Sequence, residues 1–270
     1  MNSSRVLTFV LLTLLSISLR CQTTILYENF TDNHRKWDED TTETEECNVR
    51  NGKYNIKVNH LDGWHWFFHN AEINNDRDWI VESTIHLDKT ESERDFFGLL
   101  WGAKDAHNIF RFVYFNNLKT AVLDVNDNDT VYSLVPGVKI DSAIGPNVKF
   151  TILKSGKKNY YYINGIPICK SKAFNFFGNK IGFIAAGKIA ISVKDITIKE
   201  VDSESPIVKQ LMKKFPQTEE REYYYNEFGW TFGEPVKGAG IKNATREDCQ
   251  KYRVFTVDGN DEVVGCTLSD

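Results

Sequence analysis

Residues 63–70 read Gly-Trp-His-Trp-Phe-Phe-His-Asn, a run of six aromatic and imidazole side chains. In an extended strand, successive side chains point to opposite faces, so one face carries Trp64, Trp66 and Phe68 and the other carries His65, Phe67 and His69. Exposed aromatic rings stack against the apolar C–H faces of sugars, while nearby polar groups bind the hydroxyls. The stretch is therefore either a ligand platform or a strand of an aromatic core.

A platform would draw its polar groups from this stretch and from other strands. The candidate ligand-binding residues are Trp64, His65, Trp66, His69, Arg111 and Tyr161. In the competing interpretation, which we favour for the tryptophan face, the tryptophans fill the core and the histidines are ordinary surface. The remaining aromatic residues would then support the C-terminal segment.

Residues 124–130 resemble the start of a calcium loop, with Asp124, Asn126 and Asn128 as candidate ligands. A helix–loop–helix calcium site needs Gly at its sixth position and Glu at its twelfth, where this chain has Asp129 and Val135. The segment therefore favours a hairpin turn, with calcium as the alternative. No other cofactor is predicted, and no nucleophile elbow, phosphate loop or dinucleotide fingerprint assigns a catalytic residue.

Four cysteines follow Cys21, which allows three alternative pairings. Cys249 and Cys266 flank one short segment and are natural local partners, which leaves Cys47 with Cys169. The alternative is that some or all of these thiols are free and buried. No Cys/His spacing suits a zinc site.

Residues 1–21 are typical of a secretory signal peptide, because Arg5 precedes about twelve apolar-leaning residues, too few to span a bilayer. Cleavage near Cys21 would begin the mature chain at about Gln22. Lipid anchoring at Cys21 is the alternative, although Arg20 stands where a lipoprotein signal has a small residue. We expect a secreted or cell-surface protein, and no later stretch predicts a membrane span.

The charges argue against a nucleic-acid partner. The 270 residues include 33 basic and 37 acidic side chains, and the net charge is -4. No basic stripe interrupts this mixture.

Period-two alternation runs from about residue 24 to residue 201, as in Tyr54–Asn59, and turn residues such as the Asn-Gly pairs at 51–52 and 164–165 punctuate it. About twelve short strands without helical periodicity predict an all-β, two-sheet antiparallel sandwich. Segment 96–101 is apolar on both faces, which places it mid-sheet with both sides covered. A bulge near Lys194–Asp195 would bring the last strand's isoleucines to one face.

Residues 202–270 differ from this pattern. Ser205 is a candidate N-cap before Pro206, and an apolar stripe through Phe215 predicts one short helix that docks on the sandwich. Residues 252–257 and 262–266 predict a small hairpin, which a Cys249–Cys266 bridge would stabilise.

The order of the motifs is also informative. Asn51-Gly-Lys-Tyr54, Phe97-Gly-Leu-Leu-Trp-Gly102, Asn108-Ile-Phe-Arg-Phe112, Tyr161-Tyr-Ile-Asn-Gly165 and Ile191-Ser-Val-Lys-Asp-Ile-Thr-Ile198 follow one another. Over about residues 25–201 this order resembles the laminin-G-like, concanavalin A-like jelly-roll domains of secreted bacterial proteins. The resemblance implies a jelly roll, but the superfamily includes lectins, hydrolases and adhesion modules. Its glycosidases carry Glu-x-Asp-x-Glu on one strand, which this chain lacks.

The sequence thus predicts a signal peptide (1–21), a jelly-roll sandwich (22–201), and a helix with a small extension (202–270). The leading functional hypothesis is a secreted, non-catalytic module that binds carbohydrate or a protein partner through the face of a sheet. The alternatives are a glycan-cleaving enzyme with dispersed carboxylates and a structural or adhesion component.

Overall fold

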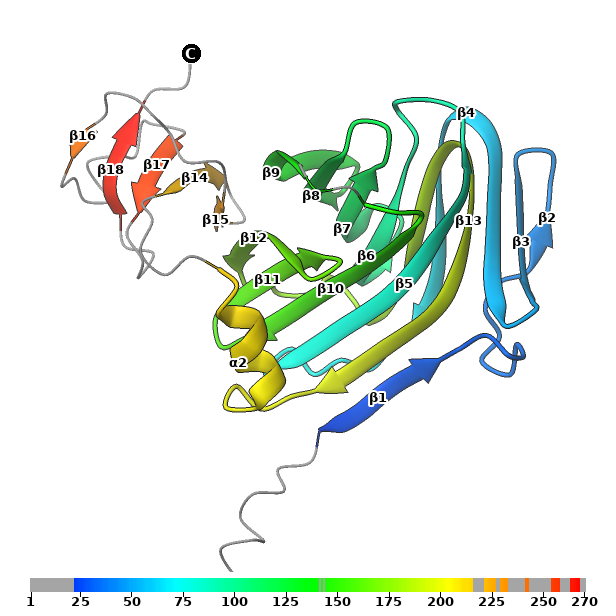
Figure 1. The fold of residues 1–270 in the computed structure, drawn as a ribbon, viewed down its shortest axis with the longest axis horizontal. Coiled ribbons are helices and arrows are strands. Elements are labelled where there is room, and N and C mark those ends of the chain that lie inside the picture. The colour runs from blue at the N-terminus through cyan, green and yellow to red at the C-terminus, as the bar shows by residue number, and fades with distance from the viewer. Residues whose placement is uncertain are drawn as a thin grey trace, which may run out of the picture.

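The computed structural model describes residues 22–215 apart from Asp141 and Ala143, and five strands between residues 221 and 267. The predicted signal peptide and Cys21 lie outside the described residues. The described chain is almost entirely antiparallel β-structure arranged in two layers, which we name sheet I and sheet II (Figure 1). It forms the jelly-roll sandwich that the sequence predicts.

Sheet I has the spatial order β9-β8-β7-β6-β13-β4. Its strands are β4 (Lys53–Asn70), β6 (Phe96–Asp105), β7 (Asn108–Phe115), β8 (Thr120–Asp127), β9 (Thr130–Lys139) and β13 (Lys180–Glu200).

Sheet II has the order β12-β11-β10-β5-β13-β4-β3-β2, and β1 pairs with the end of β13. Its further strands are β1 (Thr23–Glu28), β2 (Asp40–Thr41), β3 (Glu45–Arg50), β5 (Trp79–Thr90), β10 (Asn147–Ser155), β11 (Lys158–Ile163) and β12 (Ile166–Lys172).

The long strands β4 and β13 belong to both sheets and lie side by side (Figure 1). Residues 180–186 of β13 pair with 64–70 of β4 in sheet I, and residues 187–193 pair with 54–60 in sheet II. Between these halves β13 continues from Ala186 directly to Gly187, whereas β4 inserts residues 61–63. An odd insertion reverses the alternation of side chains along β4.

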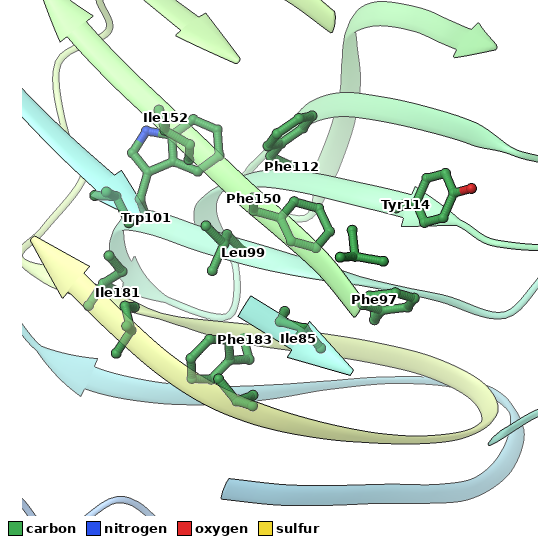
Figure 2. Close-up of a cluster of buried hydrophobic side chains, with 14 of the residues drawn as sticks. Ile85, Phe97, Leu99, Trp101, Phe112, Tyr114, Phe150, Ile152, Ile181 and Phe183 are labelled. Atoms are coloured by element: carbon green, nitrogen blue, oxygen red, sulfur yellow. The ribbon is translucent and has the colours of Figure 1, made fainter. Parts of the chain in front are cut away.

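The core lies between the two sheets and is rich in aromatic side chains. Figure 2 shows side chains of sheet I meeting those of sheet II: Phe97, Leu99, Trp101, Phe112, Tyr114, Ile181 and Phe183 against Ile85, Phe150 and Ile152. Alternate residues of the same sheet I strands point the other way. They form a second apolar layer, the outer-face cluster, of Phe96, Leu100, Ala103, Ile109, Val113, Ile184 and Ala186. Segment 96–101 is thus covered on both sides, as predicted.

The local turn and bulge predictions are confirmed. Asn51-Gly52 and Asn164-Gly165 take positive φ at both positions, as the tight turns of hairpins require. The β8–β9 hairpin turns at Asn128-Asp129, which also have positive φ. The register of β13 against β5 shifts between Val193 and Asp195, where the sequence predicts a bulge.

The predicted helix is α2 (Pro206–Met212), and the Ser205 side chain accepts a hydrogen bond from the Val208 backbone N–H as its N-cap. Val208 and Phe215 pack against Ile80, Leu153, Tyr160 and Tyr162 of sheet II, so the helix docks on the sandwich as expected. In the described part of the chain, no helix is long and apolar enough to cross a membrane.

The C-terminal segment contributes β14 (Arg221–Asn226), β15 (Gly229–Phe232), β16 (Ile241–Lys242), β17 (Val254–Val257) and β18 (Val263–Thr267). Strands β17 and β18 pair antiparallel, which confirms the predicted hairpin. Strand β15 extends the edge of sheet II through a Ser171–Thr231 pair.

Candidate functional site

The aromatic stretch of β4 presents its tryptophans to the outer face of sheet I, away from the core. Phe67 is 3% exposed and belongs to the core between the sheets, whereas Trp64 is 39% exposed. Trp66 and Phe68 pack against the outer-face cluster. The favoured prediction of a tryptophan core is therefore wrong, because the insertion at residues 61–63 reverses the alternation that begins at Tyr54.

Arg111 lies near the middle of the outer face. Cross-strand partners form a row from Phe68 through Gly182, Leu100 and Arg111 to Asp124. Paired residues of antiparallel strands face the same side, so this row places one cation and one carboxylate among the apolar residues.

The Arg111 side chain is held from two directions. Its Nε donates to Asp124 Oδ1 at 2.5 Å, and its guanidinium carbon lies 4.2 Å from the centroid of the Trp64 ring. Arg111 is only 1% exposed. Burial raises the pKa of the Asp124 carboxyl, and the guanidinium opposes that rise. The pair therefore supports Trp64 from beneath through a cation–π contact.

Several polar atoms of this face are buried without a hydrogen-bond partner. They are Nη1 and Nη2 of Arg111, Nε1 of Trp66 and Oδ1 of Asn126. Buried polar groups are nearly always paired, so a cluster of exceptions calls for an explanation. Three of these four atoms are donors, which suits a ligand rich in oxygen.

The other three candidate ligand residues do not lie on this face. His65 contacts the Glu45 carboxylate, and His69 stacks on Trp37 with ring centroids 5.0 Å apart. Both histidines share the inward side with Phe67, at the rim of the core. Burial lowers the pKa of His69, with a further contribution from Arg35.

Tyr161 is wholly buried between the sheets, where its ring packs near Trp101 and Phe112. Its hydroxyl lies 3.2 Å from Ser171 Oγ, and burial raises its pKa. The assignment of Tyr161 to a ligand surface is therefore wrong, because its position on β11 faces inward.

The candidate calcium ligands serve other roles. The Asp124 carboxylate binds Arg111, Asn126 donates to the Ala106 carbonyl, and Asn128 donates to Asp127 within the hairpin turn. Among the described residues, no group of three or more His, Cys, Asp or Glu side chains is arranged to hold a metal ion. Strands β8 and β9 pair on either side of Asn128-Asp129, so the segment forms the hairpin that the sequence favours.

The predicted Cys47–Cys169 disulfide is wrong. Both thiols are free and buried, and Cys47 Sγ donates to the Asp38 carbonyl at 3.3 Å. Cys47 is on β3 and Cys169 on β12, and strands β11, β10, β5, β13 and β4 lie between them in the order of sheet II. The proposed Cys249–Cys266 bridge lies outside the described side chains.

Sequence reasoning missed the partnership of Arg111 with Asp124 and the cations at the margins of this face. Lys180 lies 5.6 Å above the Phe68 ring, and Lys139 pairs with Thr120 at the edge of sheet I. One signal was present: Arg111 is a charged residue within the two-sided apolar strand 109–113. Its partner could be found only from the register of β7 against β8.

No protein-family model and no curated protein matches this chain. Among solved structures, a carbohydrate-binding module from Bacillus subtilis is 14% identical, with a TM-score of 0.42 over 67% of this chain and 95% of that chain. A protein of unknown function with a galectin-like fold from Bacillus subtilis is 12% identical, with a TM-score of 0.49 over 66% of this chain and 96% of that chain.

The catalytic domain of an endo-1,3-beta-glucanase (laminarinase) from Thermotoga petrophila is 9% identical, with a TM-score of 0.48 over 67% of this chain and 98% of that domain. Likenesses at this level carry no functional argument. The function therefore rests on the geometry of the outer face.

Proposed function

We propose that this protein is an exported, non-catalytic module that binds carbohydrate through the outer face of sheet I. The observation that carries the proposal is the exposed Trp64 ring, which Arg111 supports from below. A large flat ring exposed at the surface suits stacking against a sugar. Trp66 and Phe68 extend the same face along β4.

The arrangement favours binding over hydrolysis. Most glycosidases use two carboxyl groups about 5–10 Å apart that flank the scissile bond. Among the described residues that the strand pairings place on this face, Asp124 is the only carboxylate, and it binds Arg111. A glycan-cleaving enzyme is the alternative class, and a protein ligand on the same face is the alternative partner.

Export is part of the proposal, and residues 1–21 support it as a signal peptide. The mature chain would then act outside the cell or at its surface, where polysaccharides are available as ligands. Calcium is not needed by the proposed site, whose contacts come from aromatic rings and Arg111.

The test is affinity electrophoresis of the mature chain in gels that contain single polysaccharides. Trp64→Ala should weaken binding about tenfold or more, the equivalent of about 1.4 kcal/mol, because the stacking surface is lost. Tyr27→Ala is the matched control, since Tyr27 is an aromatic residue of β1 that is 55% exposed. Equal retardation of Trp64→Ala and wild type would contradict the proposal. Release of reducing sugar by the wild type would favour the enzyme.

A further inference from the structure

The two terminal nitrogens of the Arg111 guanidinium are buried on the outer face without hydrogen-bond partners. Its Nε is bound to Asp124, while Nη1 and Nη2 are buried and have no partner. A guanidinium can donate five hydrogen bonds, and charged donors are costly to bury unpaired. Two adjacent donors at the end of a planar fork match the two oxygens of a carboxylate.

The charges around Arg111 also favour an anion. Among the described residues that the strand pairings place on this side are three cations, Arg111, Lys180 and Lys139, and one carboxylate, Asp124. The surplus is local, because the whole chain has a net charge of -4. An acidic ligand would therefore be attracted to this face more strongly than to the average surface.

Trp64 stands between this fork and solvent. Its ring contacts the guanidinium and remains 39% exposed, so no buried packing fixes its outward side. Rotation of the ring away from Arg111 gives up the cation–π contact and the edge-on contact with the Phe96 ring, whose centroid lies 5.8 Å away, in exchange for access to Nη1 and Nη2. The displaced ring then lies beside the bound group, where it can stack on the sugar that carries it.

We propose that the ligand is an acidic polysaccharide built from uronic acids. Its carboxylate binds Nη1 and Nη2 of Arg111 side by side, and Trp64 acts as the lid that opens to admit it. This inference rests on the proposed carbohydrate-binding function and adds the chemical class of the ligand. It assigns Asp124 the positioning of Arg111 through Nε.

The test uses pairs of ligands that share one sugar backbone and differ in whether they carry an acidic group, measured by isothermal titration calorimetry on the mature chain. Polygalacturonate and its methyl ester share one sugar backbone, and dextran sulfate and dextran are the matching sulfate pair. Wild type should bind polygalacturonate at least tenfold more tightly than the ester. This comparison needs no variant, so it does not depend on how well any substitution folds.

Two variants test whether Arg111 is the source of the preference for the acid over the ester. Arg111→Lys keeps the charge beside Asp124 but lacks the fork, so the preference for the acid over the ester should disappear. Lys139→Ala/Lys180→Ala removes two cations from the same face and should keep most of the preference. Loss of the preference in the double lysine variant alone would overturn the role of Arg111.

The outcomes separate this inference from the function on which it rests. Equal binding of acid and ester, with binding still lost in Trp64→Ala, would overturn the acidic ligand and leave the carbohydrate module standing. A preference for dextran sulfate over dextran, without a preference for polygalacturonate over its ester, would contradict a carboxylate ligand and favour a sulfated one. Failure to bind any glycan in either pair or in the wider panel would refute the function itself.

Discussion

At the scale of single residues, the outer face combines an exposed ring with a buried charge. Arg111 is paired with Asp124 and covered by Trp64, so each group limits the positions of the others. A buried ion pair of this kind adds little stability by itself, because desolvation offsets the attraction. Its value here is the placement of Trp64 and of the guanidinium fork.

Removal of one partner of this pair should be costly. Arg111→Leu leaves the Asp124 carboxylate largely buried and uncompensated, which should lower the free energy of unfolding by about 3–5 kcal/mol. The double variant Arg111→Leu/Asp124→Leu should recover much of that loss, because no unpaired charge remains. Urea unfolding measures the free energy of unfolding of both variants. A double variant as unstable as the single one would contradict this account of the pair.

His69 should make folding sensitive to mild acid. Its folded-state pKa lies below the ordinary value of 6.5 because it is partly buried against Trp37. As the pH falls through the window below 6.5, the unfolded chain takes up the proton first, so stability is lost there. Denaturant titrations between about pH 5 and 7.5 should therefore show a smaller loss for His69→Gln than for wild type.

His107→Gln is the opposite control for that titration. Asp129 raises the pKa of His107 through a hydrogen bond, so His107 contributes stability at low pH that is lost as the pH rises through its folded-state pKa. The two variants should therefore change the pH profile in opposite directions. Identical profiles for His69→Gln and wild type would show that His69 is not perturbed.

At the scale of elements, the passage of β4 and β13 from one sheet to the other decides which face carries the tryptophans. β13 makes the passage at Gly187 with φ of 85°, a conformation that favours glycine. A Cβ at this position would lie 2.0 Å from Asp95 Oδ1. The other Asp95 oxygen accepts backbone hydrogen bonds from Glu91 and Ser92, so Asp95 has little freedom to move.

Gly187→Ala should therefore lower the free energy of unfolding by about 3 kcal/mol or more, from backbone strain and from the clash together. Gly156→Ala is the matched control, because Gly156 also has positive φ but a Cβ there meets nothing within 4 Å. That control should cost only about 1–2 kcal/mol. Thermal or urea unfolding measures the loss of stability in each variant. Equal losses in Gly187→Ala and Gly156→Ala would mean that the Asp95 side chain moves to make room for the new Cβ.

At the scale of the whole molecule, the described parts of the two sheets differ in what covers their outer faces. Sheet II is covered in part by α2, whose Val208 packs with Phe215 over Ile80 and Leu153. Strand β15 lies against the edge strand β12. The outer face of sheet I, by contrast, carries the partly exposed rings of β4.

We expect the chain to be exported and to lose residues 1–21 before it binds its ligand. Expression of the full sequence in an exporting host should yield a mature form that begins near Gln22, read by intact-mass spectrometry. A lipid-modified form beginning at Cys21 would instead support anchoring. Recovery of the whole 31.1 kDa chain with Met1 retained would contradict export.

Local signals predicted most of the fold. The Asn51-Gly52 turn, the bulge before Asp195 and the Ser205 cap each depend on a few neighbouring residues, whose chemistry can be read directly. The face of Trp64 could not be predicted in this way. It depends on the insertion at residues 61–63 relative to β13, which is a pairing between segments about 120 residues apart.

The candidate site was predictable only in part for the same reason. Trp64, Trp66 and Arg111 were identified by residue type, and the structure brings them to one face. The reversed alternation turns His65 and His69 toward the inward side of sheet I, away from the outer face. Tyr161 is buried in the core between the two sheets, so it does not reach the outer face either. Asp124 was predicted as a candidate calcium ligand, but its partner in the structure is the Arg111 guanidinium.

The most direct test of the central claim is a nuclear magnetic resonance titration of the ¹⁵N-labelled mature chain with the polysaccharide that it binds best. The account predicts shifts that concentrate on the indole N–H groups of Trp64 and Trp66 and on the Nε–H of Arg111, with Tyr27 unaffected. Shifts confined to β1, to α2 or to another surface at saturating ligand would show that the outer face of sheet I is not the binding site.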